Sequence, residues 1–149
     1  MAERQASGGW FADGPDRARI LVSGEATGGV WSLMEWEIAP FEVLGAPDLG
    51  PHRHHRCEET FIVRAGFLDF LLGETLFHLE AGDTIRVPAG VRHGFANVSG
   101  APVELLVSFH PAGLETLFEA YRTDRAGAPP GDGFIADATR LFASEYEAA

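Results

Sequence analysis

Apolar and polar residues alternate in many short stretches between residues 20 and 110. Alternation with a period of two is typical of β-strands that have one buried face. Glycines fall where turns are needed, at Gly66, Gly73, Gly82, Gly90 and Gly100. The pattern predicts strands at residues 20–23, 30–38, 52–55, 60–63, 67–72, 75–79, 84–87, 94–98 and 103–109. Many short strands at near-regular spacing indicate an all-β sandwich or barrel.

The segment before this region, residues 1–19, is polar and interrupted by glycine and proline, with Trp10 and Phe11 as its large apolar residues. We interpret it as an N-terminal arm or an edge strand. A glycine-rich link at residues 24–29 joins the first two predicted strands. It lacks the lysine and the strand-to-helix setting of a phosphate-binding loop, so we expect a hairpin turn.

After Ala112 the apolar period changes to that of a helix. One amphipathic helix is predicted to start near Pro111, and a second to be capped by Asp132, after a linker at residues 123–133. The apolar positions are Leu114, Leu117, Phe118 and Tyr121 in the first helix, and Ile135, Ala138, Leu141, Phe142 and Tyr146 in the second. We therefore expect three parts: an arm (1–19), a β-barrel domain (20–110) and a helical extension (111–149) that packs on the barrel, forms a dimer contact or covers the barrel mouth.

Composition narrows the classes of partner and compartment. The chain has 149 residues, which suits one domain, and its formal net charge of −11 argues against binding to nucleic acid or an anionic membrane. No apolar run approaches the roughly 20 residues of a membrane helix, and no secretory signal is visible. A single cysteine, Cys57, is compatible with a reducing compartment. These features predict a soluble cytoplasmic protein.

Three histidines and one glutamate are the candidate chemical residues. His52 and His54 are two apart on a predicted strand, so their side chains share a face. Glu59 follows just beyond the strand's bend, and His93 comes from another strand. Three histidines and one carboxylate suit one divalent ion per chain (iron, nickel, manganese, cobalt, copper or zinc) and leave coordination positions open. The alternative is that these are ordinary surface side chains.

Glu58 competes with Glu59 for the carboxylate position. Strand alternation places Phe61 and Val63 on the same inward face as Glu59, which favours Glu59. By the same alternation His55 points away from the face of His52 and His54.

The remaining candidates are interpreted as structural. Cys57 lies in the bend and is interpreted as a structural thiol. We expect Asn97 to fix a strand end by hydrogen bonds. His78 and His110 stand alone on strands and are interpreted as surface or core residues.

Two spaced motifs carry a resemblance to a known family. They are His52-x-His54-x4-Glu59-x6-Gly66 and Gly82-x5-Pro88-x-Gly90-x2-His93-x3-Asn97. They resemble the two signature motifs of the cupin family, with 15 residues between Gly66 and Gly82, as in small bacterial cupins. In the first motif the leading glycine falls at Gly45, one residue earlier than usual. The resemblance implies a double-stranded β-helix, a jelly-roll barrel with the metal inside, and a homodimer.

The resemblance also suggests a function. Residues 24–29, the first motif and residues 67–72 are similar to single-domain bacterial cupins grouped with quercetin dioxygenases. This implies a dioxygenase that acts on a small aromatic or enolisable, flavonol-like substrate with dioxygen (O2), with Glu59 as the catalytic base. An apolar substrate pocket is predicted at Met34, Trp36, Phe61 and Phe95. The alternatives are a non-oxidative, metal-dependent isomerase, cyclase or lyase of secondary metabolism, and a non-catalytic module that binds a small molecule.

Overall fold

The computed structural model describes residues 7–40, 51–124 and 132–147. Within these ranges the chain forms strands, two α-helices and one 3-10 turn, η1 (Glu25–Thr27). The strands are β1 (Phe11–Asp13), β2 (Asp16–Val22), β3 (Ser32–Ile38), β4 (His52–His54), β5 (Glu58–Ala65), β6 (Phe67–Leu72), β7 (Thr75–Glu80), β8 (Thr84–Val87), β9 (His93–Ala96), β10 (Val103–His110) and β11 (Ser144–Tyr146). The helices are α1 (Leu114–Ala120) and α2 (Asp132–Phe142).

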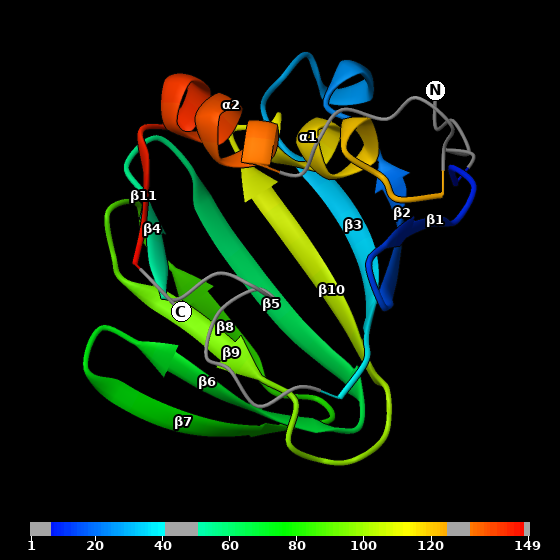
Figure 1. Ribbon diagram of the computed structural model, residues 1–149, viewed down its shortest axis with the longest axis vertical. Coiled ribbons are helices and arrows are strands. Elements are labelled where there is room, and N and C mark those ends of the chain that lie inside the picture. Colours follow the sequence, from blue (N-terminus) through cyan, green and yellow to red (C-terminus); the bar gives the residue numbers. More distant parts are fainter. Residues whose placement is uncertain (1–6, 41–50, 125–131, 148–149) are drawn as a thin grey trace.

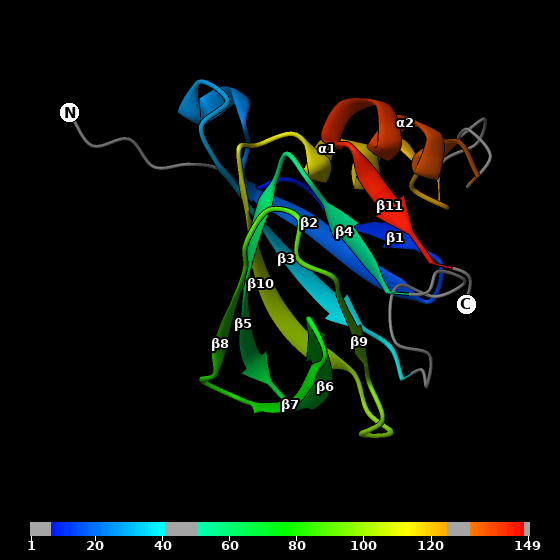
Figure 2. The same ribbon diagram turned by 90° about the vertical axis from the view of Figure 1, so that its left-hand side faces the viewer.

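Two antiparallel sheets face each other and enclose the core (Figures 1 and 2). One has the strand order β1-β2-β3-β10-β5-β8, and the other has the order β11-β4-β9-β6-β7. Both helices lie together at one end of the sheets. The predicted all-β architecture with two C-terminal helices is therefore confirmed.

Alternation along the central strands positions the site. In β10, Val103, Leu105, Val107 and Phe109 are buried, and the residues between them are less so. β5 lies beside β10 and has the same period, but the first of its buried positions is Glu59. A carboxylate therefore occupies a position that the strand pattern otherwise gives to apolar side chains.

The strand predicted at residues 20–23 begins earlier in the structure, as β2. β2 begins at Asp16 rather than at residue 20, and β1 pairs with it as an edge strand. Arg17 and Arg19 lie opposite Glu37 and Glu35 of β3 and form ion pairs with them, at 2.9 and 2.7 Å. Cross-strand ion pairs stabilise the outer face of a sheet, which explains why so polar a segment is a strand.

The C-terminal segment differs from the prediction in three ways. α1 begins at Leu114 rather than near Pro111, after Gly113, whose φ is +140°. Leu141 is 42% exposed and does not lie on a buried face. α2 ends at Phe142, so Tyr146 lies not on the helix but on β11, which pairs with β4. The cause is a reversal at Ala143, a non-glycine residue with φ +48°, which the helical period does not signal.

Parts of three predicted features lie outside the described residues. These are residues 1–6 of the predicted arm, the loop that contains Gly45, and most of the linker before α2. α2 does begin at Asp132, but the capping role predicted for that side chain also lies outside what the structure describes. The predicted hairpin at residues 24–29 is found, with η1 inside it.

Asp16 is a buried carboxyl group at the start of β2. Its Oδ1 accepts a hydrogen bond of 2.7 Å from the backbone N–H of Ala39, while its buried Oδ2 has no partner within residues 7–40, 51–124 and 132–147. Burial raises the pKa of Asp16 to about 6, the Ala39 bond opposes this change, and the charge of Asp13 adds to it. The ionised form is therefore disfavoured in the folded state.

Asp16→Asn is expected to stabilise the protein at about pH 8 by about 1 kcal/mol. Because the folded-state pKa of Asp16 lies above the unfolded value, its stabilising contribution is present at low pH and is lost as the pH rises through about 6. The advantage of the variant should therefore disappear near pH 4. Urea unfolding at both pH values, with the exposed Glu74→Gln as the control, measures this. A variant less stable than wild type at pH 8 would contradict the expectation.

Candidate metal centre

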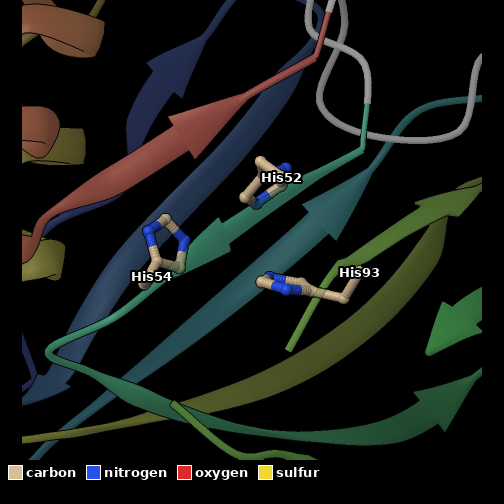
Figure 3. Close-up of side chains that lie close together, drawn as sticks. All are labelled: His52, His54 and His93. Atoms are coloured by element: carbon tan, nitrogen blue, oxygen red, sulfur yellow. The ribbon is translucent and has the colours of Figure 1, made fainter. Parts of the chain in front are cut away.

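The three predicted histidines come together inside the barrel. β4 carries His52 and His54, and His93 begins the neighbouring strand β9, where it pairs with His52. Figure 3 shows their imidazole rings turned toward a common space. One ring nitrogen from each lies within 4.8 Å of the other two, and no other such group of histidine, cysteine or acidic side chains occurs in the described ranges. The three histidines can thus hold a metal ion.

Glu59 reaches this cluster from the opposite sheet. It is 5% exposed, with its Oε2 2.7 Å from Nε2 of His93 and its Oε1 3.8 Å from Nε2 of His54. The group in which all ligand atoms lie within 4.8 Å of one another contains the three histidines without Glu59. Glu59 therefore adjoins the cluster through two of its three members.

Two buried atoms at the centre of the cluster lack a proper hydrogen bond. Oε2 of Glu59 and Nε2 of His93 form an ion-pair contact at 2.7 Å, and neither atom has a well-aligned hydrogen bond to any other described residue. Leaving buried polar atoms unsatisfied costs free energy. A cation between them would satisfy both atoms at once, so this donor set fits a divalent ion with imidazole and carboxylate ligands.

In His93 and His54, hydrogen bonds at Nδ1 leave Nε2 of each ring facing Glu59, where it can bind a metal ion. Nδ1 of His93 lies 2.9 Å from the carbonyl oxygen of Val91, which can only accept, so Nδ1 donates to it and Nε2 is the nitrogen that faces Glu59. Nδ1 of His54 lies 2.5 Å from Oγ of Ser144, which occupies that nitrogen and leaves Nε2 on the side of Glu59. Such outer contacts orient metal-binding imidazoles.

The buried charges act strongly on one another. Burial would raise the pKa of Glu59, but the charges of His54 and His93 outweigh it and lower that pKa to about 2. Burial lowers the pKa of His93, but the carboxylate of Glu59 outweighs this effect, so the pKa of His93 is raised. For His54 burial dominates, and its pKa is lowered. At neutral pH Glu59 is therefore an ionised carboxylate, which is the form that binds a cation.

A small cavity of about 40 Å³ adjoins the cluster, and its walls are mainly aromatic. Three of the predicted pocket residues, Trp36, Phe61 and Phe95, line it. The fourth, Met34, is fully buried in the core and is not one of the lining residues. The other apolar or aromatic residues in the wall come from the C-terminal extension: Leu114, Phe118, Phe134 and Tyr146. The helices thus close part of this cavity, and the role of its walls toward a substrate stays a prediction.

The sequence alone did not identify Ser144 and Tyr146 as members of the site. Ser144 contacts His54, and the ring of Tyr146 stacks on His52 with 5.1 Å between centroids and 23° between planes. No short motif marks either residue.

Two residues near the ligands lie outside the cluster. Glu58 forms an ion pair with Arg86 on the outer side of β5. The side chain of His55 is 43% exposed and lies 3.2 Å from Glu145.

Cys57, Asn97 and His78 have other surroundings. Cys57 is a buried free thiol whose pKa is raised to about 12, chiefly by burial, so it is not a reactive thiolate. Asn97 is buried, and its Nδ2 donates to the carbonyl oxygens of Ile38 and Ala101, which agrees with the structural role expected for it. His78 pairs with Asp69, and His110 is exposed at the end of β10.

Within the described ranges, no helix has the length and apolar character needed to span a membrane.

Comparison with known proteins places the fold. The family model described as "Cupin domain" matches residues 37–109. Among solved structures, KdgF from Halomonas sp. is 17% identical over 72% of this chain and 90% of its own, with a TM-score of 0.61. The Schizosaccharomyces pombe Cnp3 cupin domain is 17% identical over 70% of each chain, with a TM-score of 0.54.

A Streptomyces PAC13 variant solved with uridine is 16% identical over 71% of this chain and 78% of its own, with a TM-score of 0.54. No curated protein sequence matches the chain. At these identities the solved structures support the fold and not an activity. The family match and the two-sheet architecture together show that residues 37–109 form a small cupin domain.

Proposed function

We propose that this protein is a metal-dependent dioxygenase of a small aromatic or enolisable compound with adjacent oxygen atoms. In this proposal His52, His54, His93 and Glu59 hold one divalent metal ion. The observation that carries it is the pair of buried, unsatisfied atoms on Glu59 and His93, placed beside an aromatic-walled cavity. The ion, when bound, supplies a Lewis acid with open positions for substrate oxygens and O2.

Glu59 is the residue suited to move a proton. It is ionised at neutral pH, and it lines the cavity that a substrate would enter. A substrate hydroxyl or an acidic C–H that approaches the cluster can give its proton to this carboxylate. The charges of His54 and His93 outweigh the effect of burial and keep Glu59 unprotonated, so it is free to accept a proton.

The cavity walls favour a flat, uncharged substrate. Trp36, Phe61, Phe95, Phe118 and Phe134 present aromatic surface that excludes water and packs against a ring. No arginine or lysine is among the lining residues of the described part of the chain, so a phosphate group would lack a counter-charge there.

The wall also has a hydrogen-bond donor for an oxygenated ring. The buried indole N–H of Trp36 has no partner within the described ranges, so it is available to a substrate oxygen. This donor and the aromatic walls together support an aromatic compound with hydroxyl or carbonyl groups.

Metal content tests the ligand assignment. His54→Ala and His93→Ala should each lose most of the bound metal, because every ligand removed from a small site sharply weakens it. Elemental analysis after reloading with iron, nickel, manganese, cobalt, copper or zinc should give about one ion per wild-type chain. His78→Ala, which alters a histidine paired with Asp69, is the control and should keep the wild-type content. Wild-type content in both site variants would contradict the assignment.

Oxygen uptake tests the reaction. Metal-loaded wild type should consume O2 with flavonols or related enediols, and Glu59→Gln should lower kcat by about 100-fold or more because the base is lost. Rates are compared per bound metal ion, so that weaker metal binding is not mistaken for slower chemistry.

Glu58→Gln is the matched control, since Glu58 is the adjacent carboxylate and pairs with Arg86 on the outer side. No uptake with any of these compounds would count against a dioxygenase. Turnover of the same compounds without O2 would instead indicate an isomerase, cyclase or lyase.

A further inference from the structure

After α2 the chain returns to the barrel and lies beside the two histidines of β4. β11 pairs antiparallel with β4, with Ser144 opposite His54 and Tyr146 opposite His52. Residues directly opposite in an antiparallel pair project from the same face of the sheet. Figure 3 shows β11, in red, running next to the strand that carries His52 and His54. Each of these histidines therefore has its own neighbour on β11.

Ser144 is placed to fix the ring of His54. It is 2% exposed, and its Oγ lies 2.5 Å from Nδ1 of His54. This hydrogen bond orients the ring of His54 so that its Nε2 faces Glu59. Val91 does the same for His93 through its backbone carbonyl. The ring of His54 is thus oriented by a side chain from a distant segment, whereas the ring of His93 is oriented by a backbone carbonyl two residues earlier in the chain.

Tyr146 is placed to fix the ring of His52. Their rings are nearly parallel, at 23°, with centroids 5.1 Å apart, and Tyr146 also lines the cavity. Ser144 and Tyr146 are two apart on β11, so their side chains lie on the same face of the strand. One short strand thus links two of the three histidines.

We propose that β11 is part of the metal centre, with Ser144 as the positioning residue for His54 and Tyr146 as the positioning residue for His52. The inference rests on the proposed function in one respect, namely that the cluster binds a metal ion. Outer contacts of this kind change metal affinity by about 10- to 100-fold in other metal sites. The metal affinity of this chain should therefore depend on β11, although β11 supplies no ligand.

The test measures the dissociation constant of Co²⁺ by competition with a chromophoric chelator, together with the visible absorption spectrum of the bound ion. Ser144→Ala should weaken binding by about 10- to 100-fold and change the spectrum. Ser144→Thr keeps the hydroxyl and should restore both. Tyr146→Leu should weaken binding through loss of the stack on His52, and Tyr146→Phe, which keeps the ring, should do so less.

Glu145→Gln is the matched control on the same strand, because Glu145 points outward to Arg53 and His55 and is 67% exposed. Thermal melting of the metal-free variants separates positioning from folding. Variants that melt lower but bind Co²⁺ as wild type does would overturn the inference and leave the proposed function intact. Absence of Co²⁺ binding by wild type itself would overturn both.

Discussion

The contact between the buried carboxylate of Glu59 and the imidazoles of His54 and His93 is the interaction on which the site depends. An isolated charge at this depth would be very costly, and the barrel tolerates it because His54 and His93 arrive from the opposite sheet. The apolar period of β5 fixes where the carboxylate points, and the pairing of β4 with β9 fixes where the imidazoles point. The site is therefore a contact between the two sheets rather than a feature of either one.

The C-terminal extension, residues 111–149, contributes part of the cavity wall. Leu114 and Phe118 of α1, Phe134 of α2 and Tyr146 of β11 form the part of the cavity wall that the barrel strands leave open. These aromatic rings also pack on one another, with Phe118 between Trp36 and Phe134. The cavity wall away from the cluster is thus mainly aromatic.

Much of the fold and the core of the site could be predicted because both rest on local patterns. Alternation located the central strands within a few residues, and the motif spacing singled out His52, His54, Glu59 and His93, which the structure brings together. The segment after Phe142 could not be predicted in this way. Its residues continue a helical period, and the reversal occurs at Ala143, where no glycine marks it.

Met34 shows a second limit of prediction from sequence. It lies inward on β3, as expected, but an inward side chain in a barrel can belong to the packed core or to the cavity wall. Strand period fixes the face and not the depth along the barrel. Depth depends on sheet twist and on which helices cover the end, and neither is encoded in a local pattern.

The contact between Ser144 and His54 joins residues that are 90 positions apart. The strands of a hairpin such as β6–β7 are joined by a few residues. The contact between Ser144 and His54 instead closes a loop that includes most of the sequence of the barrel, and this costs more chain entropy. Contacts of high sequence separation form late when their entropy must be offset by structure already in place. The site is therefore complete only when a segment distant in sequence has docked on β4.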